Sequence, residues 1–267
     1  MAGVLLHWAM GDPKILDPDD PAYGVSYKRA YALGLLLPDI AKQDLIGSRA
    51  EFERFFEGCS EADIMTYNEY LLFKLNHHFN PDRRDPSQQD TRDPKLQDFL
   101  SAGYADPKKP VWAGVLCHLM GDKAFYYGEY CVEDERAMED FRREVGEIGA
   151  WDRNRWKNSE TGRTYYEDYD VLNQRIEDQY KVLDRMRRIL PASLLDELVN
   201  CFSVGFSAAR IEPVYMNLEN IRRYIALSHE LCRGIAEGNE GDLEEALSCF
   251  ENGSLDAVFC GPAPDPE

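Results

Sequence analysis

Residues 110–125 read PVWAGVLCHLMGDKAF and carry the pattern of an α-helix. Proline is favoured at the first position of a helix, so we expect Pro110 to begin one. Beyond it, side chains recur at spacings of four, three, four and three, which places them on one helical face. They are Val111, Val115, His118, Asp122 and Phe125. The segment therefore predicts a helix whose apolar face also carries a histidine and an aspartate.

The rest of the chain divides into similar blocks, separated by glycine and proline. No long stretch alternates between apolar and polar residues with a period of two, as an exposed β-sheet would require. Further helices are expected near residues 132–148, 165–189, 191–209, 214–237 and 240–251. The sequence therefore predicts an all-α, multi-helix fold, with a single helical domain over residues 1–260. Residues 261–267 are rich in proline and aspartate and are expected to form a disordered tail.

Two further helices have predicted ends. One is expected over residues 26–36, with Ser26 as its N-cap and Pro38 as its stop. The other is expected to begin at Ser60 and to end before Pro81. The buried stripe of that second helix is expected to contain Ile64, Leu71, Leu72, Leu75 and Phe79.

The chain is strongly acidic, with 49 acidic and 30 basic side chains and a formal charge of −19. Such a surface repels the phosphates of nucleic acids and anionic lipid headgroups unless a cation intervenes. Nucleic acid is therefore not an expected partner. Hydrophobic residues make up 44% of the chain and aromatic residues 12%, which is enough to bury a sizeable core.

The cysteines and the N-terminus bear on the cellular compartment. Seven scattered cysteines include no CxxC pair, so neither a disulfide framework nor a zinc knuckle is expected. The apolar run at residues 4–6 lacks basic residues before it and is broken by His7, unlike a secretory signal. No window approaches a transmembrane span. These features predict a cytoplasmic protein.

The five histidines, at positions 7, 77, 78, 118 and 229, are few enough for their placement to be informative. Residues four apart on a helix lie roughly 5–6 Å apart at Cβ, so His118 and Asp122 can bind one metal ion together. The alternative is that Asp122 accepts a hydrogen bond from His118 and the pair is a polar couple in the core. His78 falls on the apolar face of its predicted helix, either as a second ligand or as a core residue.

Three more residues have two possible roles each. Asp39 follows an apolar run and Pro38, so it can bind a metal or serve as the N-cap of a short helix from Ile40. His7 lies in an apolar segment, where it can bind a metal or pack in the core. His229 can complete a metal site by folding back, or it can be an ordinary surface or core residue.

Taken together, these residues resemble the superfamily of zinc-dependent phospholipases C and zinc single-strand nucleases. Residues 32–40, ALGLLLPDI, are similar to that family's glycine, apolar and Pro-Asp-Ile segment, and residues 114–122, GVLCHLMGD, to its Gly-x-x-x-His-x-x-x-Asp helix. The resemblance spans about residues 5–125 and implies an all-α fold in which zinc ions activate water for attack on a phosphate ester. The metal ligands that it implies are His7, Asp39, His77 or His78, His118 and Asp122.

The chain also departs from the family pattern. Members with three metals carry further histidines and a glutamate after the His-x-x-x-Asp helix, whereas residues 123–147 contain no histidine. Carboxylates such as Glu129 or Glu133 would have to rebuild the missing position. We therefore expect one or two zinc ions, or another divalent metal in their place.

Three functions follow as hypotheses. The first is a metal-dependent hydrolase acting on a small phosphate monoester or diester, with Asp39, His78, His118 and Asp122 as ligands. Asp39 could alternatively act as the general base. The second is a non-catalytic binding or structural protein that keeps a degenerate metal site. The third is a partner-binding helical module that uses the aromatic side chains of residues 104–130 and 151–169, for which ordinary helix packing is the alternative.

Overall fold

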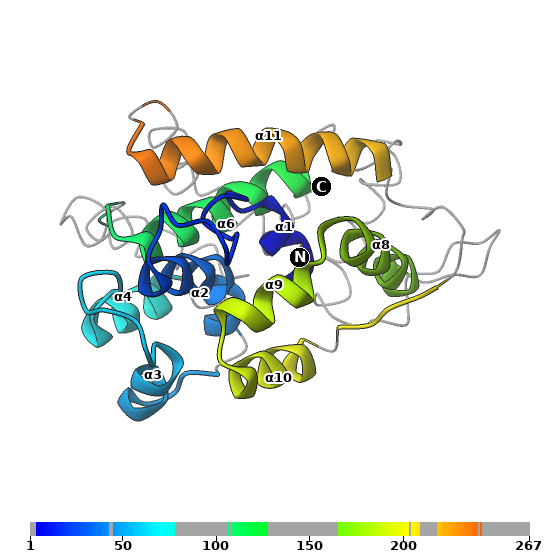
Figure 1. Ribbon diagram of the computed structural model, residues 1–267. Coiled ribbons are helices and arrows are strands. Elements are labelled where there is room, and N and C mark those ends of the chain that lie inside the picture. The colour runs from blue at the N-terminus through cyan, green and yellow to red at the C-terminus, as the bar shows by residue number, and fades with distance from the viewer. Residues whose placement is uncertain are drawn as a thin grey trace, which may run out of the picture.

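The computed structural model describes residues 4–42, 45–77, 106, 108–127, 165–202, 204–208, 218–239 and 241 (Figure 1). Over these residues the chain forms nine helices and no strand, which confirms the predicted all-α class for this part of the protein. The helices are α1 (Val4–Met10), α2 (Val25–Lys42), α3 (Arg49–Phe55), α4 (Tyr67–His77), α6 (Pro110–Tyr127), α8 (Tyr165–Tyr180), α9 (Val182–Ile189), α10 (Ala192–Cys201) and α11 (Leu218–Glu237). Among them, no helix is both long and apolar enough to cross a membrane.

Helix α1 lies at the centre of this arrangement, in contact with α2, α6, α8, α9 and α11 (Figure 1). All seven of its residues are buried, including His7. A helix that is apolar nearly all round is stable only where neighbours cover every face, and α1 is such a helix. A polar side chain on α1 must therefore find its partners inside the protein.

Among the described helices, α2 and α6 make the most extensive contact. Two glycines allow it: a Cβ atom added at Gly34 would lie 2.1 Å from the carbonyl oxygen of Val111, and one added at Gly114 would lie 2.2 Å from that of Tyr31. Both distances are far below van der Waals contact, so any side chain at either glycine would force the helices apart. The glycines thus bring the backbones of α2 and α6 together, four residues before His118 on α6.

The prediction that Pro38 ends its helix is wrong, because α2 continues to Lys42 with Pro38 inside it. A proline within a helix costs about 3 kcal/mol or more, since it removes one hydrogen bond and crowds the preceding turn. Burial of Leu37, Ile40 and Ala41 beside it offsets that cost. Asp39 therefore lies within α2 and is not the N-cap of a separate helix.

The predicted start at Ser60 is also wrong, because α4 begins at Tyr67. Thr66 and Glu69 form a capping box there: the Glu69 N–H donates to Thr66 Oγ1 at 3.2 Å, and the Thr66 N–H donates to the Glu69 carboxylate. The predicted stripe fails in part, since Leu71 and Leu72 are each 37% exposed. Tyr70 and Phe73 form the buried face of α4 instead.

The remaining predicted helices are shifted or shortened. The helix expected over residues 165–189 is divided at Lys181, whose φ of 51° is left-handed, into α8 and α9. The helix expected over 191–209 ends at Cys201, and that expected from 214 begins at Leu218. The helices predicted near 132–148 and 240–251 and the tail at 261–267 lie outside the described residues, and the single domain over 1–260 stays a prediction.

Candidate metal centre

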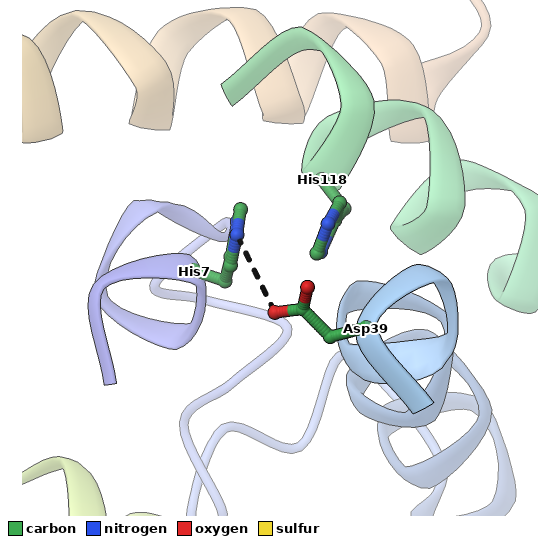
Figure 2. Close-up of side chains that lie close together, drawn as sticks. All are labelled: His7, Asp39 and His118. Carbon is green, nitrogen blue, oxygen red and sulfur yellow. Dashed lines mark ion pairs between the residues drawn. The ribbon is translucent and has the colours of Figure 1, made fainter. Parts of the chain in front are cut away.

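Three of the predicted metal ligands, from three different helices, meet in the core (Figure 2). His7 comes from α1, Asp39 from α2 and His118 from α6, and one candidate ligand atom from each lies within 4.8 Å of the others. His7 Nε2 is 3.9 Å from Asp39 Oδ2. Two ligands of one tetrahedral zinc ion, each about 2.0–2.1 Å from it, lie roughly 3.3 Å apart. The three side chains are therefore close to the spacing that a single ion requires.

The two imidazole rings lie face to face. Their centroids are 3.6 Å apart and their planes are inclined by 15° (Figure 2). The lone pair of an imidazole nitrogen lies in the plane of its ring, so nearly parallel rings must splay before both can point at one ion. Binding of one metal ion by both rings therefore requires at least one of them to rotate.

A main-chain contact sets the tautomer of His118. Its Nδ1 lies 2.7 Å from the carbonyl oxygen of Leu35 on α2. A carbonyl oxygen can only accept, so Nδ1 carries the proton and donates it, which in the neutral ring leaves the lone pair on Nε2. Metal-binding histidines commonly donate their other ring N–H to a carbonyl or carboxylate in this way, which fixes the orientation of the ring.

Burial sharpens the electrostatics of the group. His7 and His118 are fully buried, and Asp39 is 1% exposed. Within the described part of the chain, no donor makes a hydrogen bond to Asp39 Oδ1. Burial of a carboxylate is costly unless a positive charge lies beside it. A divalent metal between the carboxylate and the imidazoles would supply that positive charge.

Several of the predicted metal ligands lie outside the part of the chain that the structure describes. Asp122 lies on α6 one turn after His118, but its side chain is outside the described atoms, as is that of His77 at the end of α4. His78 is itself outside the described residues, as are Glu129 and Glu133. The pairing of Asp122 with His118 and the choice between His77 and His78 therefore stay predictions.

His229 has a different position from the one that a folded-back ligand would need. It lies half-buried on α11, and its Nε2 donates to the carbonyl oxygen of Ala9 at 2.7 Å. Burial lowers its pKa from the ordinary value, which favours the neutral ring. His229 therefore fastens the end of α1, two residues from His7, and does not join the group of three candidate ligands.

A second contact fastens the segment that follows α1. The Asp12 N–H donates to Tyr31 Oη on α2 at 3.0 Å, and Tyr31 Oη lies 3.5 Å from Cys117 Sγ on α6. Burial is the main reason that the pKa of Tyr31 is raised well above its ordinary value, so its hydroxyl stays protonated. These contacts tie α1, α2 and α6 together next to the three candidate ligands, as a preorganised site requires.

The sequence reasoning missed the Leu35 carbonyl, since a main-chain acceptor has no signature of its own. The one sequence signal for this contact is Pro38, three residues after Leu35, because a proline disturbs the hydrogen bonds of the preceding turn.

Comparison of the chain with protein-family models, with curated proteins and with solved structures finds no match. The chemistry of the site therefore has to be argued from its own residues.

Proposed function

We propose that this protein is a metal-dependent hydrolase of phosphate esters, in which His7, Asp39 and His118 hold a divalent cation, with zinc as the best-fitting ion. The observation that carries the proposal is the meeting of two imidazoles and a carboxylate, from three helices, inside the core. Their nitrogen and oxygen donors are those that zinc prefers. The small phosphate-containing substrate is the part of the proposal that comes from the sequence resemblance.

The kind of donors favours catalysis over a purely structural ion. Structural zinc sites usually have four protein ligands, most of them cysteines, whereas catalytic sites usually have three and keep a position for water. Among the described residues, His7, Asp39 and His118 offer two imidazoles and a carboxylate, and none of the three is a cysteine. Zinc lowers the pKa of a bound water to about 7, which makes hydroxide available at neutral pH. Asp39 is close enough to the group to serve as a base if another residue replaces it as ligand.

The charge of the chain supports the same choice. A protein with a formal charge of −19 repels a phosphate ester, unless a cation offers a local positive centre. One or two metal ions would provide this positive centre. We propose Asp122 and His78 as their further ligands. The metal would thus serve both to attract the phosphate and to activate the water.

A second candidate, a non-catalytic metal centre, is favoured by the burial of the group. None of the three side chains is more than 2% exposed, and they join α1, α2 and α6 at the centre of the described fold. An ion held there would stabilise the packing of three helices whether or not a substrate reaches it. Under this second candidate function, the protein binds the metal ion but does not hydrolyse a substrate.

The test begins with the metal content of protein purified without chelator. We expect about one equivalent of zinc or more, which Asp39→Asn should remove at unchanged side-chain volume. Asp19→Asn is the matched control, because Asp19 is an exposed aspartate that accepts a hydrogen bond from Arg188 at 2.9 Å. If neither zinc nor another divalent metal binds, both candidates are wrong.

Hydrolysis then separates the two candidates. The metal-loaded protein is assayed with a chromogenic phosphomonoester, a phosphodiester and a phosphocholine ester. Turnover that Asp39→Asn abolishes and Asp19→Asn preserves supports the hydrolase. Metal bound without turnover of any of the three supports the non-catalytic centre.

A further inference from the structure

Pro38 lies inside α2, in the turn that follows Leu35. In an uninterrupted helix the N–H of residue 38 would donate to the carbonyl of Gly34. Proline has no N–H, and its ring crowds that carbonyl, so the Gly34 carbonyl lacks its usual donor within α2. Neighbouring helices can supply donors to backbone groups that a proline disturbs.

The neighbouring helix α6 supplies such a donor. His118 Nδ1 donates to the Leu35 carbonyl oxygen at 2.7 Å, although in a regular helix that oxygen points along the helix axis toward its own partner, the N–H of residue 39. The glycine contact at Gly34 and Gly114 brings α6 close enough for a side chain of α6 to reach the backbone of α2. The turn that contains Pro38 and the close approach of the helices thus meet at two consecutive residues of α2, Gly34 and Leu35.

We propose that Pro38 is a positioning residue: by opening the turn of α2 it turns the Leu35 carbonyl toward α6, where that carbonyl holds the Nδ1 proton of His118 and leaves Nε2 to bind metal. The last clause rests on the proposed function, whereas the link from Pro38 to the His118 tautomer does not. Asp39 follows Pro38 directly, so the same turn of α2 orients one histidine ligand through a carbonyl and also carries the carboxylate ligand.

The hydrogen bond can be tested in the metal-free wild-type protein. Nitrogen-15 NMR of the imidazoles, at a pH of about 8, distinguishes a ring protonated on Nδ1 from one protonated on Nε2. The signals of His118 are assigned by their loss in His118→Gln. We expect the Nδ1–H form of His118, and a proton on Nε2 would overturn the proposal. If the protein binds no metal, this measurement still decides the tautomer while the proposed function fails.

The role of Pro38 is tested by Pro38→Ala, which restores the N–H that the turn lacks. We expect the variant to fold with equal or higher melting temperature, because alanine is the best helix former. We also expect a larger fraction of His118 in the Nε2–H form and a zinc affinity lower by about tenfold or more, as is typical when the outer partner of a ligand histidine is lost.

Pro191→Ala is the matched control, because Pro191 stands at the N-cap of α10, which carries none of the three candidate ligands. It should leave both the tautomer and the zinc affinity within about twofold of wild type. If Pro38→Ala also keeps the wild-type tautomer, the proposal is wrong. A Pro38→Ala chain that fails to fold contradicts it as well, since the restored hydrogen bond should close the turn without loss of helix.

Discussion

The imidazole rings of His7 and His118 stack with their centroids 3.6 Å apart and so join α1 to α6 (Figure 2). Two imidazolium cations at this separation would repel each other strongly in a buried site, so the stack requires at least one neutral ring. Neutral imidazole is also the form that binds a metal ion. The stack therefore leaves at least one ring in a form that could bind a metal ion, with the Asp39 carboxylate beside it.

Zinc should stabilise the folded protein. An ion that binds the folded chain alone raises the free energy of unfolding by about 2.7 kcal/mol when present at 100 times its Kd. We expect added zinc to raise the melting temperature of metal-free protein by several degrees, and EDTA to reverse the shift. Asp39→Asn should melt at the same temperature with and without zinc. A zinc-dependent rise in melting temperature equal to that of wild type would show that Asp39 is not a ligand.

The glycine contact between α2 and α6 should tolerate no side chain. Gly34→Ala and Gly114→Ala each gain about 1 kcal/mol of helix propensity, but the new Cβ would meet a carbonyl oxygen of the other helix. We expect each to lower the free energy of unfolding by about 1–3 kcal/mol, measured by urea denaturation. Gly47→Ala is the control, because its Cβ would have only an ordinary contact at 3.6 Å from Glu51. Equal stability of Gly34→Ala and wild type would contradict the close packing.

The helical class could be predicted because its signals are local. Pro110 at the first position of α6 and the spacing from Val111 to His118 depend on one helix alone, and α6 is observed as expected. The end of α2 could not be predicted from Pro38, because the burial of Leu37 and Ile40 that offsets a proline depends on other helices. Likewise, Thr66 rather than Ser60 caps α4, and both residues have side chains suitable for a cap.

The candidate site was predicted residue by residue and not as an arrangement. The scarcity of histidine, the Pro-Asp segment and the family resemblance predicted a set of ligands that included His7, Asp39 and His118 along with His78 and Asp122. No local pattern shows that His7 stacks on His118, because that contact depends on how α1 crosses α6 in the core. The bond from His118 to the Leu35 carbonyl has the same origin. The sequence can identify candidate ligands, whereas the packing of the helices determines which of them lie close together.

Stability should depend on pH through His229. Burial lowers its pKa below the ordinary value of 6.5, although the bond to the Ala9 carbonyl partly opposes this. As pH falls, the unfolded chain therefore binds a proton at this position before the folded one does. The contribution of His229 is fully present above about pH 6.5 and is lost as pH falls toward the folded value.

The measurement compares the urea midpoints of wild type and His229→Gln between about pH 7.5 and 5.5. Glutamine can keep the hydrogen bond to Ala9 but does not titrate, and the other histidines are common to both proteins. We expect wild type to lose more stability than the variant over this interval. Equal losses would show that His229 makes no contribution to the pH dependence.

Two substitutions of His118 should separate its role as a ligand from its role in packing. The amide of asparagine occupies nearly the position of Nδ1 and can donate to the Leu35 carbonyl, but it offers nothing in place of Nε2. His118→Asn should therefore keep most of the wild-type stability and lose the zinc-dependent rise in melting temperature.

His118→Ala should lose the zinc-dependent rise as well, and it also leaves a cavity and a buried Leu35 carbonyl without this donor. Its free energy of unfolding in EDTA should be lower than that of His118→Asn by about 1–3 kcal/mol. The free energies of unfolding of the two variants are measured by urea denaturation in EDTA, and the zinc effect by melting with and without zinc. If His118→Asn retained the zinc effect, Nε2 would not be a ligand, and if the two variants were equally stable in EDTA, the bond to Leu35 would add nothing to the fold.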